Sequence, residues 1–205
     1  MQLKGKTAII TGGGSGFGAS MADLFAKNGA KVIVADIDID SARKVAEGTG
    51  GYALEVDVSN ATSVEQMKID IFKEYEKVDI VVNNAGTTHL PAPMETIEED
   101  EFDRVFNVNC KSVYLTAKHF VPHFKENKSG VILNIASTAG VSPRPNLNWY
   151  NSSKGWMILA SKTMAVELAP FGIRVNVINP VAGETPLLMA TLFSWRKGRY
   201  VKLEH

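Results

Sequence analysis

Short apolar runs alternate along this chain with longer segments in which apolar residues recur at helical spacing. Most of the runs are rich in Val and Ile and are bounded by turn residues, as is typical of strands buried on both faces of a parallel sheet. We therefore predict strands at residues 7–10, 32–35, 52–56, 80–82, 131–135 and 175–178. The segments with helical spacing predict helices near residues 17–28, 40–47, 60–76, 98–126 and 150–169.

This alternation predicts βαβ units with right-handed crossovers. It therefore predicts an α/β fold, a doubly wound parallel sheet of at least six strands in the Rossmann-like arrangement. Asp40 and Asn60 are candidate helix N-caps, and Pro170 with Gly172 is expected to end the last helix. No linker, low-complexity stretch or repeat is visible, so we expect residues 1–190 to form a single dinucleotide-binding and catalytic domain.

Composition narrows the class of protein. The 205 residues include 22 Lys and Arg against 22 Asp and Glu, and a zero net charge disfavours a nucleic-acid or membrane-surface binder. No apolar run approaches the roughly 18 residues that a membrane span needs. The single cysteine, Cys110, excludes an internal disulfide and fits a reducing compartment. With no signal peptide visible at the start, we expect a cytoplasmic protein.

A glycine-rich segment, residues 11–18 (TGGGSGFG), follows the first predicted strand and opens the first helix. Glycines allow positive φ and let the backbone approach a pyrophosphate, while the helix N-terminus offers free N–H groups. A tight strand-to-helix turn would also use glycines, but the position within a βαβ unit favours dinucleotide binding. The predicted cofactor contacts here are Gly12, Gly14, Ser15, Gly16, Phe17 and Gly18.

Asp36 ends the second predicted strand, eighteen residues after Gly18. A carboxylate there can accept hydrogen bonds from the adenosine ribose and repels a 2′-phosphate. Because no Arg or Lys stands at positions 35, 37 or 38, NAD(H) is favoured over NADP(H). Asp36 could instead be a turn or cap residue, a role that suits Asp38 and Asp40 better. Asp57, at the end of the third strand, could meet the adenine amino group or serve as an ordinary turn residue.

Tyr150 and Lys154 are four residues apart at the start of a predicted helix, so both project from one face. A lysine ammonium beside a phenol stabilises the phenolate and lowers the tyrosine pKa towards neutrality, which makes Tyr150 a candidate general acid/base. Taken alone, the pair could be an ordinary solvated helix face. Ser137 follows the fifth predicted strand, and the carboxyl ends of strands are where open α/β sheets bind ligands.

Together these residues resemble the short-chain dehydrogenase/reductase family. The matching motifs occur in the family's order and spacing at residues 11–18, 83–86, 109, 137, 150–154 and 179–180. The resemblance implies an NAD(H)-dependent oxidoreductase that transfers a hydride between the nicotinamide and a secondary alcohol or ketone. It also implies a homodimer or homotetramer built through the helices that begin near residues 100 and 150.

The resemblance implies a role for each site residue. Tyr150 would exchange the proton with the substrate oxygen, and Ser137 would hydrogen-bond that oxygen in an oxyanion-type role. Lys154 would also hold the nicotinamide ribose. Asn109 would anchor a water of a proton relay, although the residues alone favour a helix-kink or cap asparagine. The further cofactor contacts would be Val58, Asn84, Ala85, Gly86, Pro180 and Thr185.

Two features depart from the family pattern. Val181 stands where a glycine usually follows Pro180, and beyond Thr185 we find neither a seventh strand nor a substrate-covering lid. We expect residues 191–202 to be irregular and residues 203–205 to be a purification-tag remnant. A shortened or altered C-terminus leaves open a nucleotide-binding or scaffold protein without activity, which would be stabilised by NADH but transfer no hydride. Epimerase or dehydratase chemistry on the same fold is a third possibility.

Other candidate residues have simpler explanations. His119 and His123 have a spacing that can bind zinc, but no Glu lies between them and Pro122 would disturb the helix, so we predict no metal site. Cys110 is expected to be a small packed residue rather than a nucleophile. Three residues shortly before Tyr150 could line a substrate pocket or simply pack within a loop: Arg144, Asn148 and Trp149.

Overall fold

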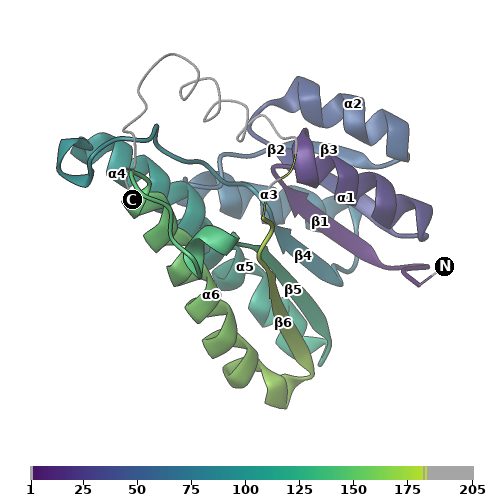
Figure 1. Cartoon of the computed structure of the whole chain (residues 1–205). Helices are drawn as coiled ribbons and strands as arrows, with labels where there is room; N and C mark the ends of the chain where they lie inside the picture. Colours follow the sequence, from purple (N-terminus) through teal and green to yellow (C-terminus); the bar gives the residue numbers. More distant parts are fainter. Residues whose placement is uncertain (1, 182, 184–205) are drawn as a thin grey trace.

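The computed structural model describes residues 2–181 and 183, and its six strands form one parallel sheet (Figure 1). The strands are β1 (Thr7–Thr11), β2 (Lys31–Asp36), β3 (Tyr52–Glu55), β4 (Ile80–Asn83), β5 (Gly130–Ile135) and β6 (Ile173–Ile178). Their order is β3-β2-β1-β4-β5-β6, with every neighbouring pair parallel. The chain winds outward from β1 to β3 and then returns to the other side of β1, which confirms the predicted doubly wound fold.

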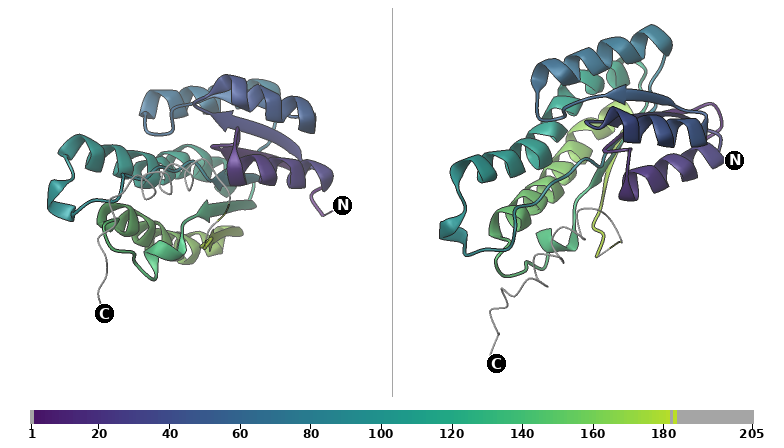
Figure 2. Two further views of the ribbon diagram at one scale, coloured as in Figure 1. Left: turned by 45° about the horizontal axis from the view of Figure 1, so that its top comes forward. Right: turned by 90° about the horizontal axis from the view of Figure 1, so that it is seen from above.

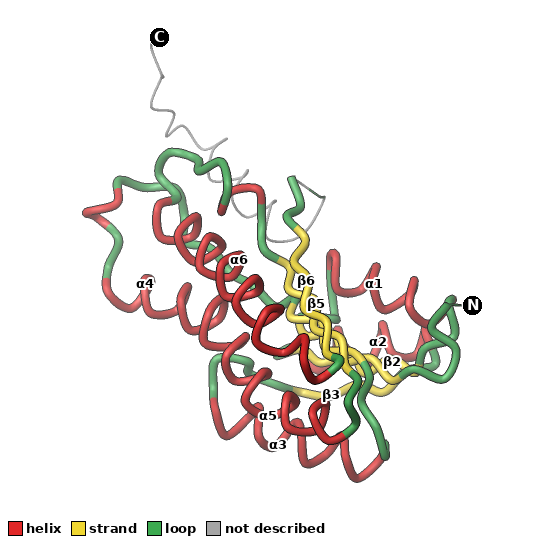
Figure 3. Tube along the Cα trace, turned by 90° about the horizontal axis from the view of Figure 1, so that it is seen from below, coloured by secondary structure: helices red, strands yellow, loops and turns green. Residues whose placement is uncertain are grey.

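Helices cover the sheet on both faces. One face carries α1 (Gly16–Lys27) and α2 (Ile39–Thr49), and the other carries α3 (Ala61–Glu74), α5 (Ser112–Glu126) and α6 (Asn148–Leu168) (Figure 3). The remaining helix, α4 (Glu99–Phe106), lies alongside α6 (Figure 2). A π-helical turn at Asn107–Lys111 joins α4 to α5, so the helix predicted at 98–126 is continuous but widens in its middle.

Alternating side chains of the central strands fill the two cores. Ile10 of β1 and Val34 of β2 pack with α1 and α2, whereas Ile9 and Ile33 pack with α3 and α5, and all four are completely buried. Burial of such a side chain contributes about 1.5–3 kcal/mol. The runs that form β1, β2, β4 and most of β5 are therefore buried on both faces, as their composition predicts. The prediction is wrong for β3 and β6, which lie at the edges of the described sheet and are partly exposed.

The N-caps of α2 and α3 test two predictions. Asn60 caps α3, because its side chain accepts a hydrogen bond from the Ser63 N–H at 3.1 Å. The expectation for Asp40 is wrong: Asp38 caps α2, and its carboxylate accepts from the N–H groups of Asp40 and Ser41. An N-cap needs an extended backbone, and Asp38 has it (φ −92°, ψ 94°), whereas Asp40 already lies in the first helical turn.

The end of α6 follows the prediction. After Leu168 the chain makes a short 3-10 turn at Ala169–Phe171, and Gly172 then adopts the left-handed conformation with φ 72°. By contrast, α5 runs through Pro122 without ending. Short 3-10 turns also occur at Met94–Thr96 and Thr138–Gly140.

None of the helices within residues 2–181 is long and apolar enough to cross a membrane. The expectations for Thr185, for residues 191–202 and 203–205, and for a missing seventh strand concern positions outside the described residues.

Candidate active site

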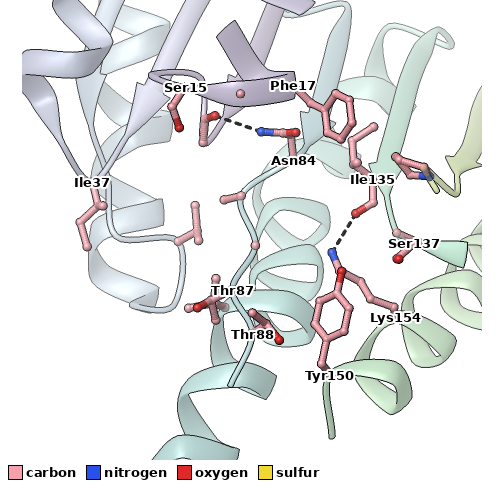
Figure 4. A pocket seen from close by; sticks show the side chains of 18 of the residues that line it. Ser15, Phe17, Ile37, Asn84, Thr87, Thr88, Ile135, Ser137, Tyr150 and Lys154 are labelled. Carbon is pink, nitrogen blue, oxygen red and sulfur yellow. Dashed lines mark hydrogen bonds between the residues drawn. The ribbon is translucent and has the colours of Figure 1, made fainter. Parts of the chain in front are cut away.

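A cavity of about 670 Å³ lies at the carboxyl end of the sheet, a size that is ordinary for a site that binds a small molecule or cofactor. Its walls come from the segments that follow all six strands, together with residues of α4 and α6. Figure 4 shows side chains from these separate segments facing one space. Because the strand order reverses between β1 and β4, this is the switch point at which doubly wound sheets bind ligands.

The glycine segment between β1 and α1 forms one wall through Gly12, Ser15, Gly16 and Phe17. Gly12 has φ +61°, and the Asn84 side-chain amide holds its carbonyl at 3.0 Å (Figure 4). The predicted contact Gly18 does not line the cavity. A Cβ at Gly18 would overlap the Gly12 carbonyl oxygen, so this position serves the packing of the helix against the turn.

Asp36 lines the cavity at the end of β2 and also shapes the glycine segment. Its Oδ2 accepts from the Gly14 N–H at 2.8 Å, and its Oδ1 accepts from the Asp38 N–H at 3.0 Å. The N–H of Gly14, a predicted cofactor contact, thus donates to Asp36, and Gly14 does not line the cavity. The turn interpretation of Asp36 is confirmed, and its position at the cavity leaves ribose binding as a prediction.

Asp57, like Asp36, belongs to a turn and also lines the cavity. One of its carboxylate oxygens accepts from the Ser59 N–H at 2.9 Å and the Ser59 hydroxyl at 2.6 Å, which is the turn chemistry that its sequence position suggests. Asp57 and Val58 also line the cavity, as do Asn84, Ala85 and Gly86 after β4, and Pro180 after β6.

Ser137, Tyr150 and Lys154 all line the cavity, on the wall made by the end of β5 and the first turns of α6 (Figure 4). The Ser137 hydroxyl accepts from the Ala139 N–H at 3.1 Å. Lys154 is 3% exposed, its Nζ donates to the Ile135 carbonyl at 2.9 Å, and Nζ lies 6.0 Å from the centre of the Tyr150 ring. The helical spacing therefore does bring the phenol and the ammonium to one face.

The expected effect of Lys154 on the pKa of Tyr150 is wrong for this structure. Burial raises the pKa of Tyr150 above its usual 10.0, opposed by the Ser137 hydroxyl and the Arg144 guanidinium. Burial also lowers the pKa of Lys154 to about 8, opposed by Cys110. Lys154 thus loses its proton at lower pH than Tyr150 does, so its charge is gone when the free phenol titrates.

Asn109 lies in the π-helical turn, is completely buried and does not line the cavity. Its Nδ2 donates to the Thr87 carbonyl and to the Ser153 hydroxyl, each at 2.9 Å, and its Oδ1 accepts from the Thr87 N–H at 2.9 Å. The side chain therefore ties the segment after β4 to α6. Its position supports the helix-kink interpretation, and π-turns of this kind often occur at functional sites.

Arg104 is a cavity residue that sequence reasoning missed. From α4 it donates to the Thr87 hydroxyl and, at 3.0 Å, to the Thr88 carbonyl, and it forms an ion pair with Glu101 at 2.8 Å. The two threonines also line the cavity. In the sequence, Arg104 is marked only by Glu101 three residues before it on a predicted helix, a spacing that is typical of an exposed surface pair.

Of the three loop residues considered before Tyr150, only Arg144 lines this cavity. Trp149 points elsewhere, since its indole N–H donates to the Met94 carbonyl at 3.2 Å. Asn148 lines a separate outer hollow, which Arg144 also borders. Further cavity residues that the sequence did not indicate are Ile37, Val56, Ser59, Val108, Ile135, Ala136, Leu147, Val181 and Gly183.

Two residues not assigned to the site have structural partners. Cys110 is buried, its Sγ lies 3.6 Å from the Ser153 carbonyl, and burial raises the pKa of its thiol to about 11, as suits a packed residue. The His123 ring contacts the backbone of Val78. Within residues 2–181 and 183, no group of three or more His, Cys, Asp or Glu side chains is placed to hold a metal ion.

Comparison with known proteins finds relatives of this chain. A family model described as short chain dehydrogenase matches residues 6–195. A 4-formylbenzenesulfonate dehydrogenase of Comamonas testosteroni is 45% identical over 193 residues, which are 92% of this chain and 77% of that protein. A 3-oxoacyl-(acyl-carrier-protein) reductase of Thermotoga maritima is 39% identical over 193 residues, which are 91% of this chain and 78% of that protein.

Among solved structures, the chain is similar to a 3-ketoacyl-(acyl-carrier-protein) reductase from Brucella melitensis, which was crystallised in complex with NADH. The TM-score is 0.91 at 48% identity, and the match covers 94% of this chain and 82% of that chain. The likeness thus extends over nearly all of the described residues.

Proposed function

The chain belongs to the short-chain dehydrogenase family of oxidoreductases, and on that basis we propose that it transfers a hydride between NAD(H) and a secondary alcohol or ketone, with Tyr150 as general acid/base. One observation carries the proposal. The Tyr150 phenol, the Ser137 hydroxyl and the Lys154 ammonium line the same cavity as the glycine segment and Asp36. The groups for proton transfer and those for holding a dinucleotide thus share one space.

The proton chemistry falls to the residues of the β5–α6 wall. Tyr150 holds the proton that passes to or from the substrate oxygen, and Ser137 donates a hydrogen bond to that oxygen as negative charge develops on it. Lys154 is mostly protonated below a pH of about 8. A phenolate that forms transiently near neutral pH is then stabilised by its charge, even though the pKa of Tyr150 is raised in the free protein.

Residues at the ends of β1 and β2 fit a dinucleotide. The turn from Gly12 leads to the N-terminus of α1 at Gly16, and the Asp36 carboxylate suits ribose hydroxyls while repelling a 2′-phosphate. We therefore favour NAD(H) over NADP(H). A bound nicotinamide supplies the hydride chemistry. Lys154, Asp57, Val58, Pro180 and the segment 84–86 complete the proposed cofactor contacts.

We propose structural roles for the predicted site residues that do not line the cavity. Gly14 and Gly18 shape the turn that meets the cofactor, and Asn109 holds the segment carrying Thr87 in place. A water relay through Asn109 remains a proposal, as does cofactor binding by Thr185.

A homodimer or homotetramer is the proposed assembly. Large apolar side chains on α5 and α6 are exposed in the single chain, among them Tyr114, Trp156, Leu159 and Val166. Exposed side chains of this kind on two helices offer apolar area for contact with a second chain. The buried single cysteine is compatible with the cytoplasmic location that we also propose.

The function is tested by following NADH oxidation at its absorbance band across a panel of ketones and aldehydes. Tyr150→Phe should reduce turnover of any active substrate by about 10²–10⁴-fold, because the phenol proton is lost, while NADH binding is retained. Tyr75→Phe, a change outside the cavity, is the matched control. Full activity in Tyr150→Phe would refute the mechanism, and NADH binding without turnover of any panel member would favour a binding protein instead.

A further inference from the structure

Ionic side chains are distributed unevenly along the cavity wall. Asp36 and Asp57 are the acidic residues that line it, and they follow β2 and β3. The basic residues follow or face the other half of the sheet: Arg104 on α4, Arg144 after β5, and Lys154 on α6. The end of the cavity that carries Ser137 and Tyr150 is therefore bordered by positive charge only, within the part of the chain that the structure describes.

Two of these cations are already engaged. Lys154 is buried and donates to the Ile135 carbonyl. Arg104 pairs with Glu101 and holds the backbone of Thr88. Lys154 already serves the proposed cofactor site, and the guanidinium of Arg104 is largely occupied by Glu101, Thr87 and Thr88.

Arg144 differs from both. Like Arg104 it is exposed, but among the described residues no carboxylate lies within ion-pair distance of it. Its guanidinium makes one hydrogen bond there, from Nη2 to the Val181 carbonyl at 3.2 Å. A guanidinium has five N–H donors, so most of its hydrogen-bonding capacity remains for another partner.

The backbone of Arg144 is held in place by its surroundings. The Asn151 side chain, which is 7% exposed, donates from Nδ2 to the Arg144 carbonyl at 2.8 Å. The neighbouring Asn146 carbonyl accepts from the Ala92 N–H at 3.0 Å, and prolines stand on both sides of Arg144, at positions 143 and 145. Such restraint lowers the entropy that must be lost when a ligand binds.

From this placement we propose that Arg144 binds an acidic group of the substrate, so that the site takes alcohols or carbonyl compounds that carry a carboxylate or a sulfonate. The inference rests on the function proposed above and names its substrate class. The planar fork of a guanidinium matches both oxyanions with two parallel hydrogen bonds. Leu147 and Val181 line the same end of the cavity and offer apolar contact for the carbon skeleton. The influence of Arg144 on the pKa of Tyr150 agrees with its facing the reacting end.

The test measures binding, so that it does not depend on turnover. Benzoate is titrated against its neutral near-isostere benzamide, and benzenesulfonate against benzenesulfonamide, by calorimetry with the full chain saturated with NADH. The native protein should bind at least one anion about tenfold or more tightly than its neutral partner, because charge-assisted hydrogen bonds are the strong ones. Arg144→Gln should abolish this preference, and Arg144→Lys should keep part of it.

Two controls separate this proposal from others. Arg174→Gln removes an exposed arginine of β6 that does not line the cavity, and it should leave the preference unchanged. Affinity for NADH should also be unchanged in Arg144→Gln. The proposal is overturned if neither anion binds better than its neutral partner, if the preference survives Arg144→Gln, or if that variant loses NADH affinity while keeping the preference. The last result would assign Arg144 to a cofactor phosphate.

Failure here and failure of the proposed function are distinguishable. The anion preference can be measured in Tyr150→Phe as well as in the native chain, since that change leaves Arg144 untouched. An enzyme that turns over only neutral ketones with native Tyr150 would overturn the acidic substrate class and leave the oxidoreductase mechanism intact.

Discussion

The two ends of the parallel strands differ in whether a buried charged side chain has a counter-charge. At the amino end, Asp79 precedes β4 and is 7% exposed, and it accepts from the Thr7 N–H and pairs with Lys6 at 3.0 Å and Lys77 at 3.2 Å. At the carboxyl end, Lys154 is buried as deeply, and its hydrogen-bond partner in the described structure is a neutral carbonyl.

The contrast separates stability from function. A buried charge with full compensation holds the structure together, as Asp79 does by joining the starts of β1 and β4. A buried cation without a counter-charge costs folding free energy, because its desolvation is not repaid. Such a group is typical of a site whose perturbed pKa serves chemistry. The amino end therefore supports the fold, and the carboxyl end carries the proposed active site.

The largest expected effect is on activity at the carboxyl end. Lys154→Met should lower kcat/KM by about a hundredfold at neutral pH. At the 6.0 Å between Nζ and the Tyr150 ring centre, attraction to a phenolate is worth about 3 kcal/mol for an effective dielectric constant of about 20. Steady-state kinetics measures the loss, with Lys162→Met on the exposed part of α6 as the control. The difference in kcat/KM between the native protein and Lys154→Met should narrow above a pH of about 8, where Lys154 loses its charge. A difference that does not change with pH would contradict this account.

Lys154 should also give the protein an unusual dependence of stability on pH. Burial lowers its pKa from 10.5 to about 8, so between these values the unfolded chain holds a proton that the folded chain lacks. Unfolding then takes up a proton, and the free energy of unfolding rises with pH, by at most about 3 kcal/mol from this group. Urea unfolding of the native chain and of Lys154→Met across this range isolates the contribution. A difference between the two that stays flat would show that Lys154 is not desolvated.

Asp79→Asn should lower stability and leave activity unchanged, in contrast to the activity loss of Lys154→Met. The free energy of unfolding should fall by about 2 kcal/mol, with unchanged kcat/KM. Burial raises the pKa of Asp79, but hydrogen bonds from Thr7, Lys6 and Lys77 outweigh this and the pKa is lowered overall. The stabilisation is therefore present above the ordinary pKa of 3.8 and is lost as pH falls through the folded-state value. Urea unfolding measures it. Asp70→Asn, which breaks an exposed pair on α3, should cost less than Asp79→Asn.

The smallest effect concerns cofactor choice. Asp36→Asn keeps an oxygen that can accept from the Gly14 N–H but removes the charge. The ratio of NADPH to NADH affinity should therefore rise by about tenfold, since repulsion of a 2′-phosphate is relieved. Fluorescence titration with both dinucleotides measures the ratio, and Asp40→Asn in the first turn of α2 should leave it as it is. An unchanged ratio in Asp36→Asn would assign Asp36 to the turn alone.

Local signals account for what could be predicted. Val and Ile runs indicate doubly buried strands without knowledge of their neighbours, and the glycines at 12 and 18 are dictated by a positive φ and by a close approach of backbone. Tyr150 and Lys154 share a face because four residues make about one helical turn. For these features the sequence by itself determined both the element and the placement of the side chain.

Other features were decided only by the tertiary structure. Arg104 and Arg144 enter the cavity, Asn109 binds the segment after β4, and Asp79 meets Lys6 across 73 positions of sequence. No local pattern marks such contacts, because they depend on which strands become neighbours. The pKa of Lys154 belongs here too, since it follows from how completely the fold removes that ammonium from water. The sequence thus predicts which chemical groups the proposed site contains, while packing in the tertiary structure determines their charge state and their partners.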